Sequence, residues 1–247
     1  MEFWLKTSGT WINVATVLLG TAIGVGLRGK LPPRLLLVIT QAVGLLTLFL
    51  GVTMAGSLTK VQAGWLDGVV LGLMALVIGG GLGEWAQIEE RLAALGDRLR
   101  RRFSGGSGFT EGFVATSLLF CVGPMTLLGS LSNGLTGDNR LIVLKAIMDG
   151  FVAIAFASSF GIGVGFSALT ILVYQGGLSL LAGLLARVIP DPAISPPILL
   201  STGVGGLMII GIGINLLELS KIRVAAFLPA LLLAPLFYTL ASHLTSR

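Results

Sequence analysis

An acidic and a basic side chain stand one helical turn apart inside a long apolar run. Asp149 follows Lys145 by four residues, and the rest of segment 141–156 is apolar or glycine. Residues four apart share a helix face, so these two could pair. A carboxylate inside a membrane costs at least about 2.5–3.5 kcal/mol unless it meets a partner or water. Asp149 therefore has three open roles: a structural ion pair, a site that binds a cation or carries a proton, or a position nearer the interface.

Polar side chains also recur at a fixed spacing of 162 residues. This spacing separates Asn13 from Gln175, and Thr53 from Asn215. Amides in membrane helices usually hydrogen-bond neighbouring helices, at roughly 0.6–2 kcal/mol each. Amides that converge where internal repeats meet would also suit a substrate site. Both interpretations stay open.

The segment Ser117–Thr126 contains a Gly-Pro step within an apolar run. Proline removes a helical hydrogen bond and kinks or breaks the helix. Broken helices are tolerated in a membrane only where protein covers them or where they line a watery cavity. The step is thus either a packing kink or a source of free backbone groups. The candidate residues for binding an ion or solute are Asp149, Lys145, Asn13, Asn215, Gln175, Gly123, Pro124 and Thr126.

The composition indicates an all-α membrane protein. The chain is 54% hydrophobic and 11% charged, with a mean hydropathy of +0.96, whereas soluble domains carry about 25% charged residues. The apolar runs do not alternate with polar residues as β-barrel strands do. A single cysteine, Cys121, and a single histidine, His243, exclude an internal disulfide, a multi-cysteine metal site and a histidine triad. We expect no enzymatic activity, cofactor or bound metal. We also expect no nucleic-acid partner, because the Lys and Arg residues border the apolar runs, where they act as topology signals.

Eight runs approach the roughly 20 residues that a membrane-spanning helix needs. They cover residues 9–27, 34–54, 66–83, 111–131, 141–160, 164–187, 197–217 and 224–243. If 111–131 enters and leaves on the same side, seven spans remain. With eight spans, ten Lys and Arg residues fall on one side and six on the other, which predicts termini outside the cytoplasm.

The chain also resembles itself. Residues 40–80 echo residues 202–242 without a gap. We therefore expect one transmembrane domain with two three-helix repeats, 9–83 and 164–243, around a central helix pair within 109–163. With eight spans, an odd number of spans precedes the second repeat, so the two repeats would cross the membrane in opposite directions as an inverted repeat. If 111–131 is re-entrant, the two repeats would instead be parallel.

The polar stretch between the third and fourth runs, 84–108, predicts a cytoplasmic amphipathic helix followed by a flexible link. Apolar residues recur every three or four positions, with Glu near the start and Arg at the end, as the helix dipole favours. Such a helix suits an anionic membrane surface. It either anchors the topology or docks a partner.

The central block Ser117–Leu131 and the motif Leu144–Gly150 resemble the bacterial membrane family called domain of unknown function 554. The segments Gly9–Asn13, Gly205–Asn215 and Leu228–Ala230 resemble it too. The resemblance covers essentially the whole chain and implies a multi-spanning inner-membrane protein, in a family often labelled as transport proteins without an established substrate. The family motif falls on Asn13, Gly123, Pro124, Lys145, Asp149 and Asn215.

Together these features predict a transporter or channel for a small ion or solute, with its site where the repeats meet. The alternative is a structural or regulatory membrane protein that binds a partner protein or a lipid. The expected surroundings are the lipid bilayer, and the glycine-rich helix faces suggest a homo-oligomer.

Overall fold

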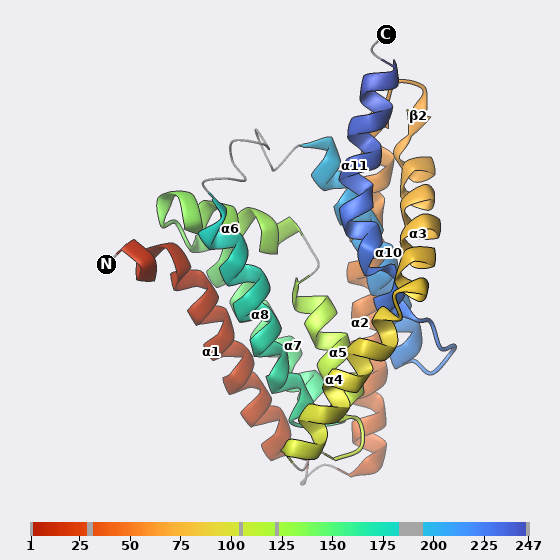
Figure 1. The fold of residues 1–247 in the computed structure, drawn as a ribbon. Coiled ribbons are helices and arrows are strands. Elements are labelled where there is room, and N and C mark those ends of the chain that lie inside the picture. Colours follow the sequence, from red (N-terminus) through yellow and green to blue (C-terminus); the bar gives the residue numbers. More distant parts are fainter. Residues whose placement is uncertain (1, 29–31, 104–105, 122–123, 183–194, 246–247) are drawn as a thin grey trace. The chain divides into compact units, whose positions relative to one another are not determined.

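The computed structural model describes residues 2–28, 32–103, 106–121, 124–182 and 195–245, and these are almost entirely helical (Figure 1). The elements are α1 (Glu2–Arg28), α2 (Pro33–Ala55), η1 (Gly56–Lys60), β1 (Gln62–Ala63), β2 (Leu66–Asp67), α3 (Gly68–Trp85), α4 (Ile88–Arg102), α5 (Phe109–Cys121), α6 (Pro124–Thr136), α7 (Arg140–Phe160), α8 (Gly163–Leu180), α10 (Pro196–Leu216), η2 (Val224–Phe227) and α11 (Leu228–Thr245). The predicted all-α membrane fold is confirmed. Seven described helical segments are long and apolar enough to cross a membrane, or eight if α5 and α6 together count as one span.

The predicted run 111–131 is not one straight helix. It divides into α5 and α6, whose axes are inclined by 61°. Proline suits the first turn of a helix, because that position needs no backbone N–H donor, and Pro124 is the first residue of α6. Gly123, the other half of the Gly-Pro step, lies outside the described residues.

The chain forms two compact units. Unit 1 comprises Met1–Val43 and Ala93–Pro190, and unit 2 comprises Gly44–Leu92 and Asp191–Arg247. The predicted boundaries follow the order of the chain, whereas each compact unit combines segments from both halves of it. Helices α2 and α4 each begin in one unit and end in the other.

Glycines bring α1 and α7 of unit 1 into backbone contact. A Cβ at Gly9 would lie 2.7 Å from Ile142, and a Cβ at Gly24 would overlap the carbonyl oxygen of Ile154. These contacts advance together along both helices, so α1 and α7 run parallel. By contrast, α8 runs antiparallel to α1, since Gly176 lies near Thr10 and Gly165 near Thr21.

In unit 2, α2 and α10 cross in the antiparallel sense, again at glycines. A Cβ at Gly51 would lie 2.7 Å from the backbone nitrogen of Ile210, and one at Gly213 would lie 2.8 Å from Leu48. Gly51 and Gly213 are 162 residues apart, and so are Leu48 and Ile210. The 162-residue spacing therefore converts one contact into the other: it relates the glycine of each contact to the glycine of the other, and likewise the two partner residues.

Helix α3 has the length and flanking residues of a membrane span. Asp67 precedes it and accepts a hydrogen bond from the backbone N–H of Val69 (2.7 Å), which fixes the first turn as an N-cap. Its 18 residues extend about 27 Å, close to the roughly 30 Å of the hydrocarbon layer. Trp65 before it and Trp85 at its end are 82% and 85% exposed, as expected for indole rings at the two membrane interfaces.

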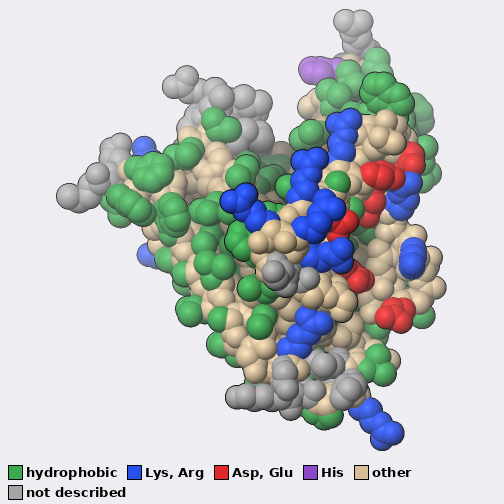
Figure 2. Space-filling model, turned by 60° about the horizontal axis from the view of Figure 1, so that its bottom comes forward, with side chains coloured by type: hydrophobic (Ala, Val, Ile, Leu, Met, Phe, Trp, Pro, Cys, Tyr) green, Lys and Arg blue, Asp and Glu red, His purple; other side chains and the backbone are tan. Residues whose placement is uncertain are grey.

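Helix α4 matches the predicted amphipathic helix, although it starts later, at Ile88, because Gln87 adopts a left-handed φ of 53°. In unit 2, Arg223 forms ion pairs with Glu84 and Glu90. Figure 2 shows Lys and Arg side chains gathered on one face of the molecule, with Asp and Glu close by. This polar face contrasts with the apolar, exposed sides of the spanning helices.

Two glycines of α3 give a matched test of this packing. A Cβ at Gly83 would overlap the carbonyl oxygen of Ala226, whereas one at Gly81 would meet nothing within 4 Å. We expect Gly83→Ala to lower stability by about 1–3 kcal/mol through overpacking. Gly81→Ala should be neutral or stabilising by about 0.5–1 kcal/mol, because alanine is the better helix former. Thermal unfolding of both variants in detergent measures the difference, and equal melting temperatures would contradict the α3–η2 contact.

Candidate functional site

The predicted ion pair forms near the middle of a span. Lys145 and Asp149 pair across one turn of α7, and only 7% and 8% of their surfaces are exposed. Asp149 lies nine residues after the first residue of α7 and eleven before its last, which is about 14 and 16 Å along the axis. Two charges at this depth are tolerated because each offsets the other and both hydrogen-bond.

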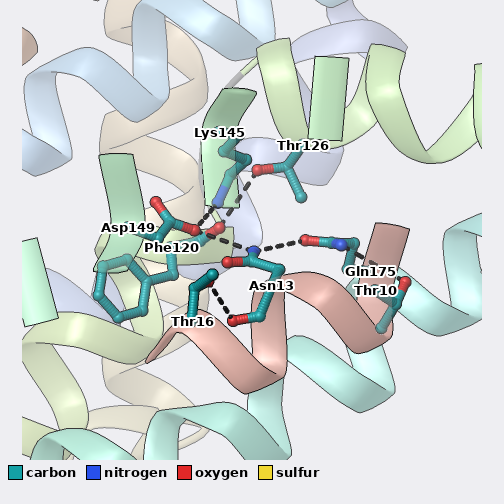
Figure 3. Close-up of polar contacts among 8 residues, drawn as sticks. All are labelled: Thr10, Asn13, Thr16, Phe120, Thr126, Lys145, Asp149 and Gln175. Atoms are coloured by element: carbon teal, nitrogen blue, oxygen red, sulfur yellow. Dashed lines mark hydrogen bonds and ion pairs between the residues drawn. The ribbon is translucent and has the colours of Figure 1, made fainter. Parts of the chain in front are cut away.

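Two further helices contribute amides to this pair (Figure 3). Asn13 from α1 donates one Nδ2 hydrogen bond to Asp149 Oδ2 and another to Gln175 Oε1 on α8, both at 2.9 Å. Gln175 Nε2 in turn donates to Thr10 Oγ1 at 3.4 Å. Asn13 and Gln175 have no exposed surface. The charge pair and the two amides, here called the charge network, therefore connect α1, α7 and α8.

The orientation of the Asn13 amide follows from its neighbours. Its nitrogen faces two acceptors, a carboxylate oxygen and an amide oxygen, so the flipped amide would place three oxygens together. The Asn13 Oδ1 atom is buried and receives no hydrogen bond from the described residues. A buried acceptor of this kind costs about 1–3 kcal/mol, and such groups are rare enough in folded proteins to need an explanation.

Small residues in α1 and α7 place Asn13 beside Asp149. A Cβ at Gly20 would overlap the carbonyl oxygen of Gly150, so a larger residue at position 20 would push the two helices apart. Gly150 itself follows Asp149 in the chain, and a Cβ at Gly150 would lie 3.3 Å from the carbonyl oxygen of Thr16 on α1. Close backbone approach of this kind is the usual role of glycine between membrane helices.

The junction of α5 and α6 lies next to the charge network. Thr126 donates a hydrogen bond to the carbonyl oxygen of Phe120 (3.2 Å), one of the C-terminal carbonyls that a helix leaves without an internal partner. The Lys145 ammonium lies 5.9 Å from the centre of the Phe120 ring, within range of a cation–π interaction. Thr126 thus belongs to the site by satisfying the backbone at the junction, and the side chain of Pro124 is not described.

Asn215 belongs to unit 2. Its Nδ2 donates to the carbonyl oxygen of Ile222 and its Oδ1 accepts from the N–H of the same residue, both at 2.7 Å. Asn215 thereby closes the turn between α10 and η2. Thr53, its counterpart at the 162-residue spacing, bonds the carbonyl oxygen of Phe49 within its own helix. The pattern of amides alone did not distinguish this turn from the site.

Two buried polar residues were not among the predicted site residues. Thr10, one turn before Asn13, extends the charge network on α1. Asn133 of α6 is fully buried, accepts from the N–H of Gly9 (3.1 Å) and donates to the carbonyl oxygen of Leu5 (2.9 Å). These two backbone groups are four residues apart, the spacing of a helical hydrogen bond. Both could have been recognised in the sequence, because each is a polar residue of an apolar helix about one turn away from another polar residue.

Comparison with known proteins gives full-length matches. A model of the family described as "Protein of unknown function (DUF554)" matches residues 8–239. The "Uncharacterized protein YqgA" of Escherichia coli (strain K12) is 30% identical over 233 residues, which cover 92% of this chain and 94% of that protein. The "Uncharacterized membrane protein YdfK" of Bacillus subtilis (strain 168) is 29% identical over 227 residues, with coverages of 92% and 93%. No solved structure matches the chain.

A double-mutant cycle tests the energetics of the ion pair. Asp149→Asn leaves an unpaired ammonium and Lys145→Met leaves an unpaired carboxylate, so each should lose about 3–5 kcal/mol of stability. The double variant Lys145→Met/Asp149→Asn removes both charges and should recover most of this loss. Thermal unfolding in detergent measures the three variants. Losses that simply add would show that the two charges do not stabilise each other.

Proposed function

The chain belongs to the DUF554 family of proteins of unknown function, and from its charge network we propose that it carries a small ion or solute across a bacterial cytoplasmic membrane. The network lies within unit 1, and Lys145 and Asp149 supply its charge. One observation carries the proposal: a buried ion pair at mid-span that hydrogen-bonds amides from two other helices. Ionisable residues at this depth commonly mark the paths of ions, protons or substrates.

Two details favour a binding role over a purely structural one. A structural network gains most when every buried polar atom is paired, yet Asn13 Oδ1 receives no hydrogen bond from the described residues. In addition, a change of helix direction between α5 and α6 lies beside the network, next to Phe120 and Thr126. Interrupted helices are how many transporters present backbone groups to a substrate.

The 162-residue spacing supports an inverted repeat. In unit 2 it relates the Gly51–Ile210 and Leu48–Gly213 contacts between antiparallel helices. In unit 1 it separates Asn13 and Gln175, which hydrogen-bond each other. Residues at equivalent positions of two repeats can meet only near the axis that relates the repeats. The proposed site therefore lies where transporter folds of this type hold their substrates.

Helix directions in unit 1 favour eight crossings. If α2 and α3 each cross once, the chain leaves α3 on the side where α1 ends. Helix α7 is parallel to α1, so it must start on the opposite side, where α1 starts. The intervening chain has to cross once, and α5 with α6 provides that bent crossing. Both termini then lie on the same side, outside the cytoplasm by the distribution of Lys and Arg.

A second candidate is a membrane protein that docks a partner without transporting anything. It is favoured by Leu95 of α4 and Phe103 just beyond it, which are 46% and 52% exposed beside the basic end of the helix. Lipid contact at the membrane surface accounts equally well for both residues. We therefore rank this candidate second.

Cysteine labelling tests the topology. With Cys121→Ala as background, we expect Lys60→Cys and Asp138→Cys to react with a membrane-impermeant maleimide added to spheroplasts. Arg98→Cys should react only after lysis, because it lies on the basic α4. Protection of position 138 together with position 98 would mean that α5 and α6 enter and leave on one side.

Flux through proteoliposomes tests the function. We expect the wild-type protein to carry at least one of Na⁺, K⁺, Li⁺, NH₄⁺, Cl⁻, nitrate or phosphate. Asn13→Ala should reduce that flux at least about tenfold, which corresponds to about 1.4 kcal/mol, the scale of one lost hydrogen bond. The control Asn215→Ala removes an amide of unit 2 and should keep the flux. Equal fluxes in the wild-type and Asn13→Ala proteins would remove Asn13 from the site, and folded wild-type protein without any flux would favour the second candidate.

A further inference from the structure

We propose that the basic end of α4 binds the headgroup of an anionic phospholipid at the membrane surface. The site consists of Arg98, Arg101 and Arg102, with Leu95 about one turn before Arg98. It lies on a surface of unit 1 outside the charge network. The inference therefore does not depend on whether the protein transports a solute.

One end of unit 1 is the place where helices α1, α5, α7 and α8 begin or end. Arg28, the last residue of α1, donates a hydrogen bond to the carbonyl oxygen of Ser107 (3.4 Å). A Cβ at Gly161, directly after α7, would overlap the Arg28 guanidinium. A Cβ at Gly163, the first residue of α8, would overlap the carbonyl oxygen of Phe109, the first residue of α5. Because α1, α7 and α8 are long and apolar enough to cross a membrane, this end belongs at a membrane surface.

The C-terminal half of α4 packs against that end. Asp97 accepts a hydrogen bond from Thr110 Oγ1 (2.7 Å) in the first turn of α5. Gly96 is buried, and a Cβ there would lie 2.8 Å from Thr110. The Phe103 ring, just beyond α4, lies 4.8 Å from the ring of Phe166 in the first turn of α8. One side of α4 is therefore fixed to the protein beside the ends of the spans.

The other side of this half carries positive charge that the described part of the chain does not neutralise. Arg98, Arg101 and Arg102 are exposed, and none of them forms an ion pair with a described residue. Arg100 differs, because it lies 3.8 Å from the carboxylate of Asp97. The helix dipole favours cations in the last turn of a helix, but it does not supply a counter-anion. Phosphate oxygens match the planar donor fork of arginine, so the three side chains suit a phosphate group.

The apolar residue beside these arginines favours a lipid over a protein or a free anion. Leu95 is 46% exposed, and at three and seven residues before Arg98 and Arg102 it shares their side of the helix. Basic helices with exposed apolar residues bind anionic membrane surfaces. A stable protein interface buries about 800 Å² on each partner, whereas this half of α4 and the residue after it expose Ala94, Leu95 and Phe103 as their apolar residues. A free anion would gain nothing from Leu95.

Lipid binding to the full-length protein in detergent tests the site. We expect native mass spectrometry to show phosphatidylglycerol bound at least about tenfold more tightly than zwitterionic phosphatidylcholine, because each arginine near an anionic headgroup adds roughly fivefold in affinity. The triple variant Arg98→Gln/Arg101→Gln/Arg102→Gln should lose this preference. The triple variant Arg98→Lys/Arg101→Lys/Arg102→Lys keeps the charge and should retain most of it. An equal preference in the wild type and the triple Gln variant would overturn the site.

Two single substitutions form a matched control. Arg102→Gln should weaken phosphatidylglycerol binding about fivefold. Arg140→Gln removes an exposed arginine at the opposite end of α7, where the side chain is 91% exposed, and should leave the binding unchanged. Equal effects of the two substitutions would show that the total charge attracts the lipid, which would overturn the assignment to α4.

Leu95 and inorganic phosphate separate a lipid from a free anion. Leu95→Gln removes the apolar contact and should weaken phosphatidylglycerol binding at least several-fold, whereas Leu95→Met keeps an apolar side chain and should not. Inorganic phosphate in excess should not displace the lipid. Displacement by phosphate, or equal binding by the two Leu95 variants, would overturn the lipid assignment.

Two further results distinguish this inference from the functions considered above. A stoichiometric protein that copurifies with the wild type but not with the triple Gln variant, with no lipid preference in either, would overturn the lipid in favour of a protein partner. Lipid binding is measured without transport, so a protein that selects phosphatidylglycerol but gives no flux would retain the lipid site and contradict only the proposed transport.

Discussion

The cost of burying charge is the constraint on which unit 1 depends. Lys145 and Asp149 lie at mid-span on one helix, where neither could remain ionised alone. Their pairing offsets part of this cost, and the hydrogen bond that the Asn13 amide donates to the carboxylate offsets more of it. The carboxylate therefore requires α1 to approach α7 closely, and the glycines at the contact are what make this approach sterically feasible.

The same constraint shapes the elements around the pair. Gln175 on α8 accepts from Asn13, so the antiparallel contact of α1 with α8 completes the donors and acceptors of that amide. The end of α5 places the Phe120 ring near the Lys145 ammonium, and Thr126 bonds the Phe120 carbonyl oxygen. Apolar side chains in place of the charge network would need none of these hydrogen bonds or ring contacts. One atom, Asn13 Oδ1, remains without a described donor, which is why a structural role alone explains the network incompletely.

In unit 2 the polar interactions have a different character. Arg223 pairs with Glu84 and Glu90 at positions that solvent reaches, and the side chains are about half exposed. Exposed pairs contribute little to stability, typically 0–1 kcal/mol. They orient the start of α4 and the turn before α11, while packing at Gly79 and Gly83 holds α3 against α11 and η2. The contrast places the candidate chemistry in unit 1.

Much of the fold could be predicted, because apolar length and residue spacing are local properties. The sequence determined the membrane class, most spans, the amphipathic helix α4 and the proximity of Lys145 and Asp149. The spacing of 162 residues also relates Asn13 to Gln175, and these two side chains hydrogen-bond each other. The same spacing also made Asn215 a candidate, because a sequence pattern does not show which helices are in contact.

Only the tertiary structure decided which polar groups meet. It placed Asn215 on the backbone of Ile222 in unit 2 and brought Asn13, Asp149 and Gln175 together from three helices. It also divided segment 111–131 into two inclined helices and added Thr10 and Asn133 to the buried polar groups. The physical reason is that a hydrogen bond between distant helices depends on backbone separations of a few ångströms. Those separations are set by glycine contacts between helices, which the order of residues along one helix does not specify.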